Sequence, residues 1–244
     1  MPHKPSDQPN LDRIKIFADG ASLPSMLESA RDPRIAGFTT NPTLMRKAGI
    51  SDYRAFAREV LAAIKDRPIS FEVFADDTSE MRRQAGEIAT WGANVYVKIP
   101  VTNTKREPTT DLVRELAGAG VKLNVTAICT VAQVRDVARA LEGGAPSVVS
   151  VFAGRIADTG RDPIPLMQES LSICRAAGKS IELLWASPRE LLNIVQAAEI
   201  GCDIITVTPD LLKKLELVGK DLGDFSLETV QMFFRDAEAA GFKL

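Results

Sequence analysis

Short apolar runs recur along the chain, and each is followed by a segment whose apolar positions have helical spacing. The repeating units predict an α/β protein built as a single (β/α)8 TIM barrel. A doubly wound open sheet is the alternative, but the turn after its first strand would lack the glycine-rich sequence that binds dinucleotides. The runs are rich in Val, Ile, Leu and Phe and predict strands at 14–19, 35–40, 69–74, 94–99, 121–126, 146–152, 181–186 and 203–207.

The two ends of the chain lie outside this repeating pattern. The first residues are polar and rich in proline, so we expect a disordered tail at 1–12 and a catalytic barrel domain at 13–244. An extra C-terminal helix is expected at 226–241, where it could cap the barrel or reach a neighbouring subunit. The pair Ser187-Pro188 predicts a helix start, with the serine as N-cap.

Composition narrows the class of protein. The chain has 244 residues, is 45% hydrophobic and 25% charged, and carries a formal net charge of -2, which gives no basic excess for binding nucleic acid. No apolar stretch is long enough to cross a membrane, so we expect a cytoplasmic protein with small-molecule partners. The three cysteines are far apart and predict no metal site. The only histidine, His3, lies in the expected tail, so acid/base chemistry in the barrel must use other groups.

Polar residues interrupt the apolar runs near the carboxyl ends of the predicted strands. Because strand side chains alternate, Lys98 shares an inward face with Tyr96, while Val95, Val97 and Ile99 face the surrounding helices. An inward lysine could simply form a buried ion pair. A cluster of polar groups at the mouth where barrel enzymes build their sites is more costly to desolvate and favours a function. The inward polar residues are Asp19, Asn41, Glu72, Lys98, Asn124 and Thr126.

A buried lysine in such a cluster suggests covalent chemistry. Burial disfavours an ammonium ion and frees the amine to attack a carbonyl, which gives a Schiff base. With no histidine in the barrel, the proton shuttle must be Glu72 or Asp19, with Thr126 available to hold a water. The protonated imine is an electron sink, so Asp19 acting as base on a substrate hydroxyl would complete a retro-aldol cleavage.

A second group of residues follows the sixth and seventh strands. Ser150 ends the sixth strand and Arg155 follows in the sequence Phe-Ala-Gly-Arg, whereas Ser187 and Arg189 lie in Ala-Ser-Pro-Arg at the expected helix start. Two arginines, a hydroxyl group and a helix N-terminus predict a phosphate site. The alternative is that the serine is only an N-cap and that the arginines form surface salt bridges.

Seven ordered motifs resemble the transaldolase family, and the short chain is similar to its smaller branch, which includes the fructose-6-phosphate aldolases. They are FADGAS, GFTTNP, SFEV, VKIP, LNVTAICTVAQ, VSVFAGRIAD and LLWASPRE, and the resemblance extends over 14–216. It implies a class I mechanism with the Schiff base on Lys98 and with Asp19 as the base on the substrate hydroxyl. It implies no metal and no organic cofactor, and association into a homo-oligomer.

The resemblance also assigns the remaining residues. Glu72 and Thr126 would hold the water that relays protons during imine formation and hydrolysis. The hydroxyls of the dihydroxyacetone unit would be bound by Asn41 and Asn124, with Ser150 near the terminal hydroxyl. The phosphate would be held by Arg155, Ser187 and Arg189.

Four positions bear on the choice within the family. The aldolases usually have Gln where this chain has Glu72, and Cys129 stands where transaldolases have Phe and the aldolases Tyr. Because a cysteine donates a proton only weakly, we expect transfer over free cleavage. Pro188 stands where an aromatic residue is usual in the family, and Trp185 stands where a small residue is usual. These two positions therefore do not fix which sugar is the substrate.

We therefore expect a transaldolase that moves a dihydroxyacetone unit from sedoheptulose 7-phosphate or fructose 6-phosphate to an aldose phosphate such as glyceraldehyde 3-phosphate. The alternatives are an aldolase that releases dihydroxyacetone, a transaldolase for a sulfonated or longer ketose, and a silent sugar-phosphate-binding protein.

Overall fold

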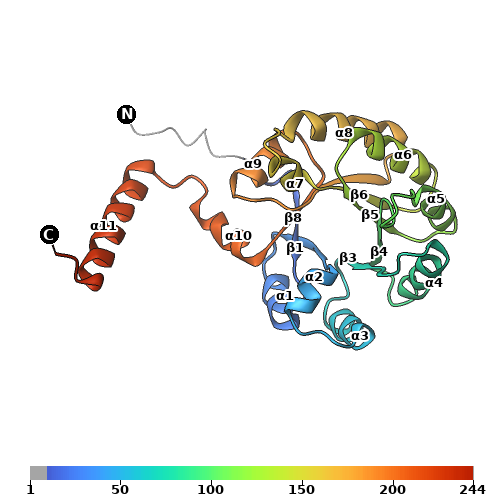
Figure 1. Cartoon of the computed structure of the whole chain (residues 1–244), viewed down its shortest axis with the longest axis horizontal. Coiled ribbons are helices and arrows are strands. Elements are labelled where there is room, and N and C mark those ends of the chain that lie inside the picture. Colours follow the sequence, from blue (N-terminus) through green and yellow to red (C-terminus); the bar gives the residue numbers. More distant parts are fainter. Residues whose placement is uncertain (1–9, 244) are drawn as a thin grey trace. The chain divides into compact units, whose positions relative to one another are not determined.

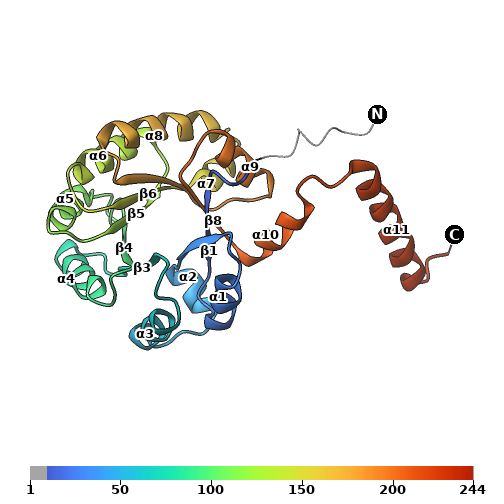
Figure 2. The same ribbon diagram turned by 180° about the vertical axis from the view of Figure 1, so that it is seen from behind.

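The computed structural model describes residues 10–243 and confirms the predicted barrel. Residues 10–213 form one compact unit in which eight parallel strands pair in chain order and close into a ring, as seen from both sides in Figures 1 and 2. The strands are β1 (Lys15–Asp19), β2 (Ile35–Thr39), β3 (Ile69–Glu72), β4 (Val95–Pro100), β5 (Leu123–Ile128), β6 (Ser147–Val151), β7 (Ile181–Trp185) and β8 (Ile204–Val207).

Helices connect successive strands and lie outside the ring (Figure 1). Most units contribute one helix, while short extra helices, α2 and α7, follow β2 and β6 directly. The barrel helices are α1 (Leu23–Ala30), α2 (Pro42–Lys47), α3 (Tyr53–Ala63), α4 (Thr78–Ala89), α5 (Thr110–Gly118), α6 (Val131–Leu141), α7 (Ala153–Ala157), α8 (Ile164–Ala177), α9 (Leu192–Glu199) and α10 (Pro209–Lys213).

The two faces of each strand separate apolar packing from polar chemistry. On β4, Val97 and Ile99 are fully buried, as expected for the face covered by helices. The barrel interior is apolar towards its middle, where Phe17, Val148 and Leu184 belong to one buried cluster. Polar inward residues lie on either side of this cluster, with Lys15 and Glu182 paired towards the amino ends of the strands and the predicted site residues at the carboxyl ends.

A glycine on β2 allows the central cluster to form. A Cβ at Gly37 would lie 2.6 Å from the ring of Phe17, so no larger residue fits without moving that ring. The pairing of β1 with β2 shifts register between Ile16 and Phe17. This irregularity is typical of a barrel strand that re-aims the side chains after it.

One helix start in the barrel differs from the sequence-based expectation. Helix α9 begins at Leu192, so the predicted start at Ser187-Pro188 is wrong. Ser187 instead has a φ of 58°, which places it in a left-handed turn and not at an N-cap. Of the tail expected at 1–12, residues 1–9 lie outside the described part of the chain.

The segment from residue 214 onward forms a separate compact unit. It contains a short 3-10 helix, Lys214–Leu217, and the extra C-terminal helix α11, Leu222–Ala240, which starts four residues before the expected position. None of the residues of α11 is buried. Within residues 10–243, no helix is long and apolar enough to span a membrane.

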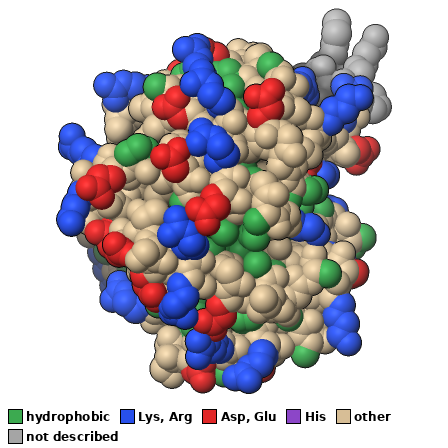
Figure 3. Space-filling model, turned by 90° about the vertical axis from the view of Figure 1, so that its right-hand side faces the viewer, with side chains coloured by type: hydrophobic (Ala, Val, Ile, Leu, Met, Phe, Trp, Pro, Cys, Tyr) green, Lys and Arg blue, Asp and Glu red, His purple; other side chains and the backbone are tan. Residues whose placement is uncertain are grey.

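The surface of the barrel carries paired charges between neighbouring helices. Arg82 on α4 binds the carboxylate of Glu115 on α5 at 2.8 Å, and Arg135 on α6 binds Glu169 on α8. On the face drawn in Figure 3, basic and acidic side chains are interspersed, with hydrophobic side chains between them. Exposed pairs of this kind contribute little to stability, about 0–1 kcal/mol each.

Candidate active site

A cavity of about 460 Å³ opens at the carboxyl ends of the barrel strands. Nine of the ten residues predicted for the site line it, and Arg189 is the exception. The cavity residues are Asp19, Thr39, Asn41, Pro42, Thr43, Leu44, Glu72, Lys98, Asn124, Thr126, Ala127, Ser150, Phe152, Arg155, Leu184, Ala186, Ser187 and Thr206.

Lys98 lines this cavity and is only 6% exposed. Its Nζ donates to the backbone carbonyl of Thr40 at 2.8 Å and lies 3.1 Å from Oε2 of Glu72. Two acceptors thus hold the amine at one point, and one of them, the carboxylate, can also take or return a proton. The arrangement suits an amine that must lose a proton before it attacks a carbonyl.

Asp19 faces the same cavity from β1. Thr39 Oγ1 donates to its Oδ1 at 2.8 Å. Burial raises the pKa of this carboxyl above its ordinary value, and the charge of Lys98 and the Thr39 hydrogen bond offset part of that rise. A carboxylate whose pKa is raised is a stronger base than an exposed aspartate, which suits proton abstraction from a hydroxyl.

Amide and hydroxyl groups from β3, β5 and β6 are joined by hydrogen bonds. Asn124 on β5 donates through Nδ2 to Ser70 Oγ at 3.0 Å, and its Oδ1 accepts from Ser150 Oγ on β6 at 2.7 Å. Asn41 caps helix α2 by accepting from Leu44 N at 3.0 Å. Its amide oxygen is thereby held, which fixes the orientation of a side chain that lines the cavity and whose NH₂ group is a donor.

A bulge in β5 turns two consecutive residues towards the cavity. The pairing of β5 with β6 is irregular between Val125 and Ile128, and Ala127 has a φ of 64°. Thr126 and Ala127 consequently both line the cavity, which a regular strand would not permit. Strained backbone of this kind costs roughly 1–3 kcal/mol and is concentrated at functional sites.

The two halves of the predicted phosphate site are brought together by a close backbone contact. Gly154 N donates to the carbonyl of Ala186 at 3.3 Å, so the start of α7 lies directly against the loop after β7. This contact places Arg155 and Ser187 on the same part of the cavity wall. Helix α9 begins too late to contribute its N-terminus, which corrects that part of the prediction.

Gly154→Ala is expected to destabilise this contact. A Cβ at Gly154 would lie 1.6 Å from the Ser187 carbonyl oxygen and 2.6 Å from its carbonyl carbon. Backbone must move, so the loss in free energy of unfolding should be at least the roughly 1–3 kcal/mol typical of overpacking. A urea titration measures it. The matched control is Gly86→Ala on α4, where nothing lies within 4 Å of the added Cβ; an equal loss in both variants would contradict the prediction.

Arg189 occupies a different position from the other predicted residues. Its Nε donates to Asp158 Oδ1 at 2.9 Å, and its second nitrogen pairs with the other carboxylate oxygen. The guanidinium is thus bound by a surface carboxylate at the end of α7, beside the cavity wall formed by Arg155 and Ser187.

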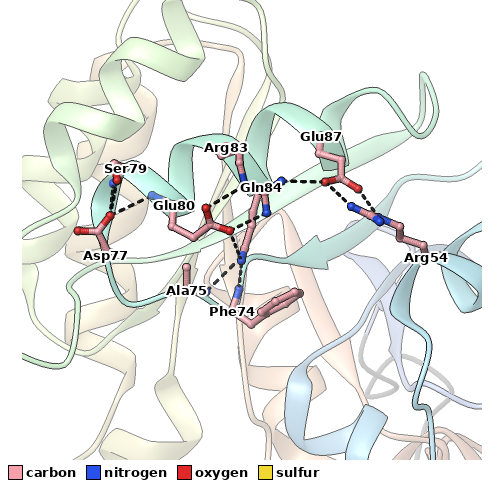
Figure 4. Close-up of polar contacts among 9 residues, drawn as sticks. All are labelled: Arg54, Phe74, Ala75, Asp77, Ser79, Glu80, Arg83, Gln84 and Glu87. Carbon is pink, nitrogen blue, oxygen red and sulfur yellow. Dashed lines mark hydrogen bonds and ion pairs between the residues drawn. The ribbon is translucent and has the colours of Figure 1, made fainter.

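The loop after Glu72 is held by a polar network on α4, shown in Figure 4. Gln84 Oε1 accepts from Phe74 N at 2.9 Å and from Ala75 N at 3.2 Å, and its Nε2 donates to Glu80 at 3.2 Å. Gln84 is buried. The network fixes the backbone that leaves β3 and so supports the position of Glu72.

The unusual residues of the motifs lie away from the cavity surface. Leu184 and Ala186 line the cavity, so Trp185 between them points to the opposite face of β7, where it is fully buried. Cys129 is half-buried, and burial raises the pKa of its thiol while Arg155 partly opposes that rise. Neither these two nor Pro188 is among the described residues that line the cavity.

Sequence reasoning missed two threonines in the cavity, Thr39 and Thr206. Thr39 Oγ1 is hydrogen-bonded to Thr206 Oγ1 as well as to Asp19. Both threonines are predictable from the sequence, because strand alternation places Thr39 on the same strand face as Asn41, and Thr206 on the same strand face as Ile204. Among residues 10–243, no group of three or more His, Cys, Asp or Glu side chains is placed to hold a metal ion.

Most of the chain matches a known protein family. Residues 16–244 match the family described as transaldolase/fructose-6-phosphate aldolase. A probable transaldolase of Dehalococcoides mccartyi is 36% identical over 202 residues, 83% of this chain and 90% of that protein. A probable transaldolase of Thermoanaerobacter sp. is 34% identical over 231 residues, 95% of this chain and 100% of that protein.

Solved structures with low sequence identity share the fold. A HpcH/HpaI aldolase/citrate lyase family protein from Burkholderia cenocepacia superposes with a TM-score of 0.58 at 15% identity, covering 89% of this chain and 95% of that one.

Proposed function

Since the chain belongs to the transaldolase/fructose-6-phosphate aldolase family, we propose that it is a class I transaldolase that works through a Schiff base on Lys98. It transfers a dihydroxyacetone unit from a ketose phosphate, such as sedoheptulose 7-phosphate or fructose 6-phosphate, to an aldose phosphate such as glyceraldehyde 3-phosphate. The observation that carries the proposal is the buried Lys98 amine, 3.1 Å from Glu72 and in one cavity with Asp19.

Imine formation uses the Lys98 and Glu72 pair. Glu72 first takes a proton from the Lys98 ammonium group. The neutral amine then attacks the C2 carbonyl of the ketose and forms a C–N bond, and Glu72 returns that proton to the carbonyl oxygen, which becomes a hydroxyl. Glu72, through a water beside Thr126, takes a proton from the nitrogen and returns one to that hydroxyl, which leaves as water. The product is a protonated imine, and the same steps in reverse hydrolyse it.

Carbon–carbon cleavage uses Asp19. Its carboxylate takes the proton of the C4 hydroxyl, the C3–C4 bond breaks, and the electron pair moves into the protonated imine to give an enamine. The aldose phosphate leaves with the new carbonyl at the former C4. Addition of an acceptor aldehyde to the enamine reverses these steps and returns the proton from Asp19 to the new hydroxyl.

Borohydride trapping tests the mechanism. Reduction in the presence of fructose 6-phosphate should fix a ketose-derived adduct on Lys98, identified by peptide mass spectrometry. Folded protein that yields no adduct with any phosphorylated, sulfonated or longer ketose would exclude the Schiff base. Affinity for a ketose phosphate without turnover or adduct would instead indicate a silent sugar-phosphate-binding protein.

Transfer is favoured over free aldol cleavage by Glu72 and Cys129, which differ from the residues usual in the aldolases. In the aldolases a tyrosine at the Cys129 position can donate a proton to a catalytic water. The Cys129 thiol, whose pKa is raised by burial, is a weak donor and does not line the cavity. Dihydroxyacetone should therefore be released slowly when no acceptor is present. Release as fast as transfer would assign the lyase activity.

Arg155→Ala is expected to weaken binding of phosphorylated sugars. Arg155 is exposed and lines the cavity beside Ser187, where its guanidinium can contact a phosphate. Loss of a charge-assisted contact should raise KM for fructose 6-phosphate about 10- to 100-fold, with KM for unphosphorylated fructose changed less than about 2-fold. Steady-state kinetics with both sugars check this. Arg135→Ala, which breaks the surface pair with Glu169, is the matched control.

A homo-oligomer is part of the same proposal, supported by the apolar surface of α11. Phe233 and Phe234 are each 63% exposed, and Phe225, Leu227 and Val230 are also exposed. Apolar side chains gathered in this way mark interaction surfaces. Sedimentation velocity should give a mass that is a multiple of the chain mass, whereas a monomer at all concentrations would contradict the proposal.

A further inference from the structure

Two buried threonines form a hydroxyl chain that ends on the proposed base, Asp19. Thr39 lies on β2 directly opposite Asp19 in the strand pairing, and Thr206 lies on β8, the other neighbour of β1. Thr39 is 3% exposed and Thr206 is 7% exposed. Thr39 Oγ1 is 2.8 Å from Asp19 Oδ1, and the two threonine hydroxyls are hydrogen-bonded to each other.

The chemistry of the three groups fixes the direction of the chain. An ionised carboxylate only accepts hydrogen bonds, so the single hydroxyl hydrogen of Thr39 is committed to Asp19. Thr39 can then take part in its contact with Thr206 only as acceptor. The hydrogen in that contact must come from Thr206, and the order is Thr206 to Thr39 to Asp19.

From this order we infer that Thr206 is a positioning residue for the cleavage step, acting on Asp19 through Thr39. It holds the Thr39 hydroxyl in the orientation that donates to Asp19 Oδ1. The substrate proton then goes to the other carboxylate oxygen, Oδ2. Polarisation along successive hydrogen bonds strengthens the one that reaches the carboxylate. The inference rests on the proposed role of Asp19 as base.

Besides the hydroxyl chain, two side chains of opposite charge face Asp19. Lys98 on β4 stabilises the carboxylate and Glu72 on β3 destabilises it, while β2 and β8 supply the threonine hydroxyls. The Thr39 hydrogen bond lowers the pKa of Asp19, partly offsetting the rise caused by burial. Weakening that bond should therefore raise the pKa of Asp19 and protonate the base at higher pH.

Thr206→Val tests the inference, because valine keeps the branched shape and removes the hydroxyl. We expect kcat to fall about 10-fold with KM within about 2-fold, and the acid limb of the kcat/KM profile to move to higher pH. Thr206→Ser, which keeps the hydroxyl, should recover most of kcat and the wild-type limb. The yield of borohydride-trapped adduct should be the same in all three proteins, because imine formation does not use Asp19.

A double-variant cycle isolates the route through Thr39. In a Thr39→Val background, Thr206→Val should change kcat by less than about 2-fold, because the chain to Asp19 is already broken. An unmoved acid limb in Thr206→Val, equal losses in the Val and Ser variants, or independent effects in the double variant would each overturn the inference. Wild-type protein that neither turns over nor traps a ketose would instead refute the proposed function.

Discussion

Lys98→Met is expected to abolish both dihydroxyacetone transfer and borohydride trapping. Lys98 supplies the only lysine amine among the described residues that line the cavity, and no other group there can form an imine. Loss of a covalent nucleophile should lower kcat/KM by at least about 10⁴-fold. Coupled assay of glyceraldehyde 3-phosphate transfer and mass spectrometry of the reduced protein give the two readouts.

The matched control is Lys122→Met. Lys122 Nζ donates to the Ala93 carbonyl at 2.8 Å and lies 5.8 Å from the centre of the Tyr96 ring, and the residue does not line the cavity. Activity and trapping should persist in this variant. An adduct of undiminished yield in Lys98→Met would show that the imine forms on another lysine.

Loss of Lys98 also leaves Glu72 without its ionic partner, so folding must be separated from chemistry. Removing one member of a buried ion pair costs about 3–5 kcal/mol, and the partial exposure of Glu72, 17%, should reduce that figure. Lys98→Met combined with Glu72→Gln removes the unpaired charge and should recover stability without recovering activity. A double variant that regains transfer would contradict the assignment of Lys98.

The inward polar cluster could be predicted from sequence because it depends on strand alternation alone. Lys98, Glu72 and Asn124 sit on regular stretches of their strands, where the pleat fixes which face each side chain takes. The parallel barrel then brings the strand ends together without further information. The same rule applies to Thr39 and Thr206, so the inward position of both residues is also predictable from the sequence.

The side of the cavity that holds Arg155 and Ser187, the proposed phosphate site, could not be predicted in the same way, because it depends on contacts between distant loops. The start of α7 meets the loop after β7 only through the absence of a Cβ at Gly154 and the left-handed backbone of Ser187. The capture of Arg189 by Asp158 joins residues 31 positions apart. No local sequence pattern encodes such a pair. A Ser-Pro sequence is also typical of a helix start, so it does not indicate the left-handed turn that forms at Ser187.

Asp19→Asn should separate the two halves of the proposed reaction. Asparagine keeps an oxygen that can accept from Thr39 but cannot take the C4 hydroxyl proton, so cleavage should slow about 10²- to 10⁴-fold. Imine formation depends on Lys98 and Glu72 and should persist. In this variant borohydride should therefore trap the intact six-carbon ketose phosphate on Lys98. In wild-type protein it should also trap the three-carbon adduct left after cleavage.

Stability gives an independent readout for the same variant. The folded-state pKa of Asp19 lies above its ordinary value of 3.8, so the native state holds the proton more tightly than the unfolded chain. The free energy of unfolding consequently falls as pH rises from the ordinary to the raised pKa, and the ionised carboxylate is destabilising at neutral pH. Asp19→Asn removes that penalty and should be at least as stable as wild type at neutral pH in urea titrations.

The exposed Asp136 on α6 provides the matched control, since Asp136→Asn changes the same group outside the cavity. It should leave turnover and the ratio of trapped adducts unchanged. If Asp19→Asn trapped only the three-carbon adduct, cleavage would proceed without this carboxylate, and the base would have to be Glu72, the other cavity carboxylate. Loss of all adducts from a folded Asp19→Asn protein would instead place Asp19 in the imine step.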